Sequence, residues 1–158
     1  MKYNFIIVIG MLCSVHGKSG NAIDLFPSDN FSQWTKVNGK PVGSGWIIKD
    51  GVIHRKSLSG DIITKEKFKD FELTFEWKIS EAGNSGIKYR TRGSLGLEYQ
   101  VLDDKKHRDN KNPTHRAGSL YELVAAPDSK SLNPVGEWNS GKIITMGDQI
   151  AVSYTHLR

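Results

Sequence analysis

The sequence predicts an all-β domain built as a two-layer sandwich or jelly roll. Apolar and polar residues alternate with a period of two in several short segments, and no segment keeps the 3.6-residue period of an amphipathic helix. The 16 glycines and 5 prolines suit many short strands joined by tight turns. A length of 158 residues allows one domain with a sizeable core.

The clearest strand is predicted at residues 71–79, where every odd position is apolar and every even position polar. Such a strand packs one face on a core and turns the other toward water or a ligand. The same alternation follows a predicted turn at 81–86 and continues through 87–90. It returns at 95–102, so three long strands are expected in the centre of the chain.

Shorter strands are expected on both sides of this central group. Asp50-Gly51 separates two apolar segments and predicts a hairpin between 46–48 and 52–54. Further strands are predicted at 61–64, 119–123 and 142–144. The connection 103–116 is polar and has no period, which is typical of a functional or mobile loop.

Residues 1–17 have the features of a signal peptide for export to the periplasm or the extracellular space. Lys2 precedes an apolar run at 5–12 that is too short to span a membrane. The alternative is a buried N-terminal strand. The single cysteine, Cys13, lies in this segment without a good lipobox before it, which argues against a lipid anchor and leaves the exported chain without a disulfide.

The charge pattern argues against a nucleic-acid partner. The formal net charge is +5, but the basic residues are scattered. Their one cluster, at 105–108, has aspartates on both sides and is typical of a solvated loop.

At the other end, residues 151–158 show no closing strand pair in the sequence. We therefore expect a domain at 23–150 that lacks its final strands, followed by a non-native tail.

Polar residues at alternate positions of the three central strands form the main candidate site. If these strands are neighbours, Glu76, Lys88, Arg90, Glu98 and Gln100 share one face. Two carboxylates beside cations and an amide suit the hydroxyl groups of a sugar. The alternative is an ordinary solvated sheet face with cross-strand ion pairs.

The segments that follow offer weaker candidates. Asp103, beside Asp104, is a candidate ligand for a divalent cation such as calcium, or a turn former. His115 is a candidate acid, base or ligand, or an exposed loop residue. Trp138 suits a platform for a sugar ring or a core anchor. Nucleophile elbows, phosphate loops, zinc spacings and dinucleotide fingerprints do not occur in the sequence.

Several motifs occur in the order found in the 3-keto-disaccharide hydrolase domain family, which residues 23–150 resemble. These motifs are Leu25-Phe26 with Trp34, Asp50-Gly51, Phe71-Glu72-Leu73, Asn84-Ser85-Gly86, Glu98-Tyr99-Gln100, Ala117-Gly118-Ser119 and Gly136-Glu137-Trp138-Asn139. Family members continue past residue 148 with further strands, and this sequence departs from them there.

The resemblance implies a concanavalin A-like jelly roll, exported, that acts on glycosides with a ketone at carbon 3. Such a ketone acidifies the proton on carbon 2, so a base can remove it, the aglycone can leave, and water can add back. That chemistry needs a base, an acid for the leaving oxygen and a donor or cation for the enolate. A non-catalytic carbohydrate-binding module on the same sandwich is the alternative.

The candidate residues can be assigned to these requirements. Glu98 is the expected base or metal ligand with Glu76 as its partner, and Arg90 is expected to stabilise the enolate. The expected substrate-binding residues are Gln100, Tyr121, Lys88, His115 and Trp138, with Asp103 as a candidate metal ligand at the edge of the site.

Overall fold

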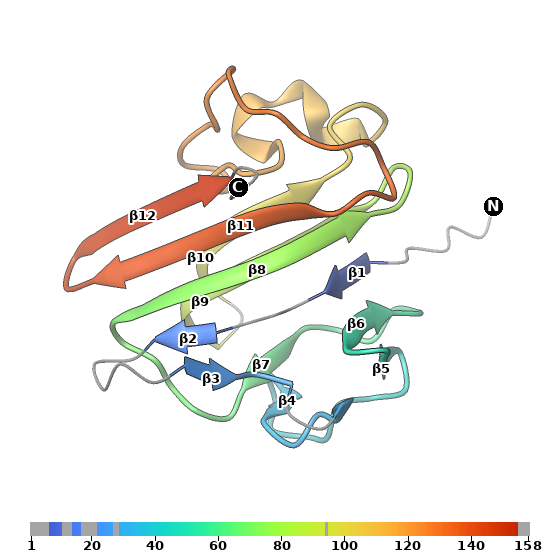
Figure 1. The fold of residues 1–158 in the computed structure, drawn as a ribbon, viewed down its shortest axis with the longest axis vertical. Coiled ribbons are helices and arrows are strands. Elements are labelled where there is room, and N and C mark those ends of the chain that lie inside the picture. The colour runs from blue at the N-terminus through green and yellow to red at the C-terminus, as the bar shows by residue number, and fades with distance from the viewer. Residues whose placement is uncertain (1–6, 11–13, 17–21, 27–28, 94, 155–158) are drawn as a thin grey trace.

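The computed structural model describes residues 7–10, 14–16, 22–26, 29–93 and 95–154 (Figure 1). These residues form strands, loops and two 3₁₀-helices, η2 (Arg108–Lys111) and η3 (Pro113–His115), with no α-helix among them. The all-β prediction is confirmed. The strands are β1 (Ile7–Gly10), β2 (Ser14–His16), β3 (Ala22–Asp24), β4 (Trp34–Lys36), β5 (Trp46–Lys49), β6 (Val52–Arg55), β7 (Ile62–Thr64), β8 (Phe71–Ile79), β9 (Asn84–Arg92), β10 (Leu95–Leu102), β11 (Asn139–Met146) and β12 (Gln149–Tyr154).

The larger sheet has the strand order β12-β11-β8-β1-β6-β5, with β2 pairing both β3 and β8. β8 is the central strand, and its odd residues are buried as their alternation predicts. β8 pairs with β11, β1 and β2 rather than with β9. The three long central strands are therefore not neighbours in one sheet.

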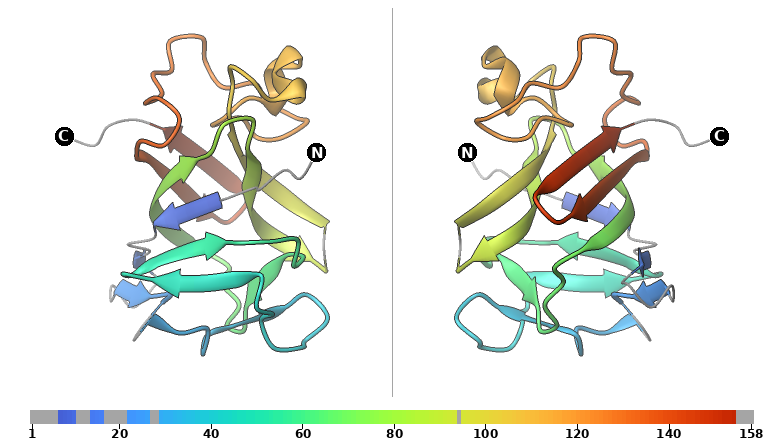
Figure 2. Two further views of the ribbon diagram at one scale, coloured as in Figure 1. Left: turned by 90° about the vertical axis from the view of Figure 1, so that its right-hand side faces the viewer. Right: turned by 90° about the vertical axis from the view of Figure 1, so that its left-hand side faces the viewer.

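β9 and β10 form a second layer that packs behind β8, and Figure 2 shows the layers from the side. The layers meet where the rings of Phe75 and Tyr99 lie edge to face, with centroids 5.0 Å apart. Gly141 makes this contact possible, because a Cβ there would lie 2.4 Å from the Phe75 ring. The core between the layers is therefore closely packed.

A short extended segment extends the second layer beyond β10. Tyr99 forms an antiparallel bridge with Leu120, and the backbone of 118–121 is hydrogen-bonded to β10 on both sides of that bridge. The strand expected at 119–123 is thus present only in part, because a tight turn joins Leu120 to Val124. The connection 103–116 contains η2 and η3 and gathers at one end of the sandwich (Figure 1).

The expected turn at 81–86 is shorter, since β9 already begins at Asn84. Residues 7–10 and 14–16 of the expected signal peptide are paired strands, while 1–6, 11–13 and 17 lie outside the described residues.

Part of the expected tail is also a strand, because 151–154 continue β12 in regular register with β11. Residues 155–158 lie outside the described part. Among the described residues, no helix is long and apolar enough to cross a membrane.

Candidate functional site

The candidate site lies on the outer face of the second layer. Since Tyr99 points into the core, its neighbours Glu98 and Gln100 point away from β8. Glu98 is paired with Lys88 on β9, and on its other side its backbone oxygen accepts a hydrogen bond from the Tyr121 nitrogen at 2.9 Å. Lys88, Glu98 and Tyr121 therefore form one row across three extended segments, with Glu98 in the middle.

Glu98 is seated against the backbone of β9. Its register neighbours place the carboxyl group beside Gly86, where a Cβ would lie 1.9 Å from Oε1. Only glycine leaves room for this position of the side chain. The sequence-based prediction that Gly86 serves a turn is wrong: it lies within β9 and makes space for Glu98.

Burial raises the pKa of the Glu98 carboxyl, while Lys88 lowers it and Asp61 raises it. The Lys88 ammonium lies 3.2 Å from Asp61 Oδ2 and forms an ion pair with it. Glu98 thus faces a cation that is already partly neutralised. A half-buried carboxyl with a raised pKa suits a group that takes up and releases a proton.

Tyr121 and His115 form the other end of the row. Their rings are 4.5 Å apart at an angle of 31°, and His115 Nε2 is 3.2 Å from Glu122 Oε1. This nitrogen is buried and not aligned for a hydrogen bond. The pKa of Tyr121 is raised by burial and by the charges of Glu122, Asp109 and Glu98, so the phenol keeps its proton and can donate it in a hydrogen bond.

Gln100 lies below the surface of the site rather than on it. Its side chain is 1% exposed, and its amide donates to Asn84 Oδ1 at 3.4 Å. A direct contact of Gln100 with a substrate would need a change in this arrangement. Asn84, half-buried on the same face, is the amide that Gln100 positions.

Three predicted site residues lie elsewhere. Glu76 is an exposed even-numbered residue of β8, so it lies on the outer face of the larger sheet, across the core from Glu98. Trp138 lies on that sheet too, with the Lys78 ammonium 4.8 Å from its ring centroid. Arg90 donates a hydrogen bond to the Gly147 carbonyl in the β11–β12 turn, and its φ of 51° marks a bulge in β9.

Asp103 is a buried loop anchor. Its carboxylate accepts hydrogen bonds from the backbone nitrogens of Ala82 at 2.7 Å, Lys105 at 3.0 Å and Lys106 at 3.3 Å. These bonds tie the start of the segment that follows β10 to the turn between β8 and β9. The described residues contain no group of three histidine, cysteine, aspartate or glutamate side chains placed to hold a metal ion.

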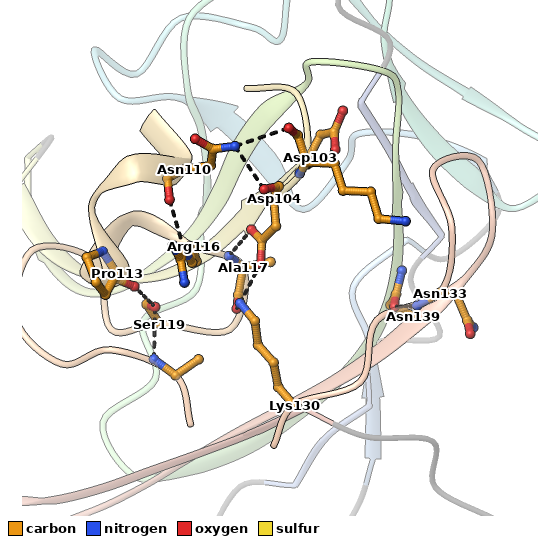
Figure 3. A network of polar contacts seen from close by, with 12 residues as sticks. Asp103, Asp104, Asn110, Pro113, Arg116, Ala117, Ser119, Lys130, Asn133 and Asn139 are labelled. Carbon is orange, nitrogen blue, oxygen red and sulfur yellow. Dashed lines mark hydrogen bonds and ion pairs between the residues drawn. The ribbon is translucent and has the colours of Figure 1, made fainter. Parts of the chain in front are cut away.

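A second anchor holds the loops that border the site (Figure 3). Lys130 Nζ lies 2.5 Å from Asp104 Oδ2 and donates to the Ala117 carbonyl at 2.7 Å. Asp104 Oδ1 accepts from the Ala117 nitrogen at 2.8 Å. This largely buried ion pair ties residue 130 to the start of the segment that carries Tyr121.

The sequence-based reasoning missed Asp61, Asn84, Gly86 and Glu122 as members of the site. Asn84 and Gly86 lie at even-numbered positions of β9, as Lys88 does. Continuing the alternation of β9 toward its N-terminus therefore predicts that they share a face with Lys88. Asp61 and Glu122 have no such signal, because each reaches the site from a loop.

Two crystal structures of Parabacteroides distasonis proteins, each titled a "putative glycosyl hydrolase", resemble this fold. The first has a TM-score of 0.74 and 28% sequence identity, covering 85% of this chain and 69% of that one. The second has a TM-score of 0.62 and 25% identity, covering 78% and 68%. The fold is thus similar to that of two proteins described as glycosyl hydrolases.

Sequence comparison gives the family. Residues 21–154 match the model of the 3-keto-alpha-glucoside-1,2-lyase-like domain, and the chain belongs to that family. It is 35% identical over 150 residues to the 3-keto-disaccharide hydrolase of Bacteroides thetaiotaomicron, covering 77% of this chain and 51% of the relative. The chain thus spans about half the length of that relative. The resemblance seen in the motifs is confirmed.

Proposed function

We propose that this domain cleaves glycosides that carry a ketone at carbon 3, by elimination followed by addition of water. The observation that carries the proposal is the Glu98 carboxyl, seated on Gly86 with a raised pKa beside Lys88 and Tyr121. Family membership and the name of the 35%-identical relative support the substrate class.

Glu98 is the base in this mechanism. Its carboxylate takes the proton from carbon 2, the electron pair forms the double bond between carbons 1 and 2, and the bond from carbon 1 to the leaving oxygen breaks. The negative charge that develops on the ketone oxygen needs a cation or a donor. Lys88 suits this role better than Arg90, since Arg90 is held at the Gly147 carbonyl.

Tyr121 is the donor for the leaving oxygen. Its raised pKa keeps the phenol protonated at neutral pH, and the stack with His115 restricts the orientation of its ring. Water then adds to carbon 1 and gives a proton to the Tyr121 phenolate, while protonated Glu98 returns its proton to carbon 2. One carboxyl group thus works in both half-reactions.

The test is release of the aglycone from a 3-keto-glucoside, with the substrate bearing hydrogen or deuterium at carbon 2. We expect Glu98→Gln to lower kcat/KM by a factor of about 10² or more, and Glu76→Gln to leave it within about twofold. A primary isotope effect supports elimination. Release that survives in Glu98→Gln would exclude the proposed base, and sugar binding without release would favour the non-catalytic binding module.

A further inference from the structure

A cavity of about 180 Å³ lies among the loops beside the site. Its walls come from the 103–130 region and are formed by Asp104, Pro113, Arg116, Ala126, Pro127, Asp128 and Lys130. A cavity of this volume has room for several water molecules or for a group of the size of one sugar ring.

η3 borders both this cavity and the Glu98 row. Its first residue, Pro113, lines the cavity and accepts a hydrogen bond from the Ser119 hydroxyl at 3.1 Å. Its last residue, His115, stacks on Tyr121. Ser119 and Tyr121 are two residues apart in an extended segment, a distance of about 7 Å. The wall of the cavity and the Glu98 row are therefore connected through two nearby residues of one segment, which places the cavity beside the row.

The lining carries two acids and two bases, which makes it neutral overall. Asp104 and Lys130 neutralise each other directly at 2.5 Å. Arg116 uses its Nε for the Asn110 carbonyl at 2.8 Å, and no contact of its terminal nitrogens is found among the described residues. The Asp128 carboxylate is exposed and makes no hydrogen bond or ion pair within the described part of the chain. The terminal nitrogens of Arg116 and the carboxylate of Asp128 can therefore bind neighbouring hydroxyl groups as donor and acceptor.

We propose that this cavity is a second sugar subsite, which binds the neutral hexose ring attached to the ring that reacts at Glu98. The order of the two rings rests on the proposed function. The capacity of the cavity to bind a neutral sugar ring rests on its volume, its lining residues and its charge. Pro113 and Pro127 supply apolar surface for the carbon face of the ring, while Arg116 and Asp128 bind its hydroxyl groups.

Binding is measured first, without catalysis, by titrating the full chain with methyl glucoside and following backbone amide shifts by NMR. We expect saturable shifts at 113–130, lost in Ala126→Leu, which fills the cavity, and weakened about 3–10-fold in Asp128→Asn. Asp148→Asn, in the β11–β12 turn, is the matched control and should bind as wild type does. Glucuronate should bind more weakly than the neutral glucoside.

Kinetic measurements then test the proposed subsite independently of the proposed function. For a 3-keto-disaccharide, Asp128→Asn should raise KM about 3–10-fold while methyl 3-keto-glucoside, which has no second ring, keeps its KM. Absence of saturable shifts at 113–130, shifts unchanged in Ala126→Leu, or preference for glucuronate would overturn the subsite. Saturable binding in the cavity without turnover at Glu98 would overturn the proposed function and leave the subsite standing.

Discussion

The carboxyl group of Glu98 lies so close to Gly86 that a Cβ at position 86 would be 1.9 Å from Oε1. Alanine in a strand is otherwise favoured over glycine by its lower backbone entropy, so Gly86→Ala isolates the effect of moving Glu98. We expect kcat/KM to fall by a factor of about 10 to 100, since small displacements of a reacting group have effects of that size.

The matched control for this change is Gly43→Ala. Its Cβ would lie 3.1 Å from the flexible end of Lys36 and from the Ser59 hydroxyl, away from Glu98. Both variants should keep the β-sheet circular dichroism spectrum of the wild type. Equal activity in Gly86→Ala and wild type would mean that Glu98 does not react from its observed position.

The charges around Glu98 predict how the activity depends on pH. If Glu98 is the base, kcat/KM rises with pH as its carboxyl group ionises. Asp61 raises the pKa of Glu98 and Lys88 lowers it. Asp61→Asn should therefore move the acidic limb of the profile to lower pH, and Lys88→Met should move it to higher pH. Identical acidic limbs in the two variants would assign that limb to another group.

The raised pKa of Glu98 also predicts a stability that depends on pH. Between the unfolded and the folded pKa, the folded chain binds more protons, so the contribution of Glu98 to stability falls as pH rises through this window. Glu98→Gln should be more stable than wild type at neutral pH. The difference should vanish below about pH 4, the ordinary range of a glutamate. Urea unfolding at several pH values measures this, and a less stable Gln variant at pH 7 would contradict it.

The alternation of residues in β8 and β10 was enough to predict the strands and the side chains that line each face. Phe75, Trp77 and Tyr99 are buried at 2%, 1% and 0% exposure, as the pattern requires. The β9–β10 hairpin pairs Glu98 with Lys88, and paired residues of antiparallel strands point to the same face of the sheet. This part of the site is determined by local sequence.

The layer to which each strand belongs is not a local property. β8 and β10 have the same alternation, yet β8 pairs with β11, which lies about 70 residues later in the chain. That pairing places Glu76 across the core from Glu98, and no periodicity within 71–79 contains this information. Arg90 was misplaced for a different reason, because a bulge in β9 ends the alternation there.

His115 is expected to act through its ring. Its Nε2 is buried without an aligned hydrogen bond, whereas its ring lies 4.5 Å from that of Tyr121. His115→Phe should keep the stack and most of the activity, and His115→Ala should lower kcat/KM about 3–10-fold, in line with the energy of an aromatic pair. Steady-state kinetics at constant pH measures both. Equal losses in the two variants would show that an imidazole nitrogen takes part.

Asp103 provides the last prediction, because its two suggested roles have opposite consequences. As a loop anchor it satisfies three backbone nitrogens, and Asp103→Ala leaves them without an acceptor. We expect a loss of about 2–4 kcal/mol and a fall in Tm of about 5–10 °C. Millimolar calcium should not change the wild-type Tm, whereas a bound cation would raise it. A calcium-dependent rise that disappears in Asp103→Ala would make Asp103 a ligand after all, and would mean that the backbone bonds it accepts here are exchanged for the ion.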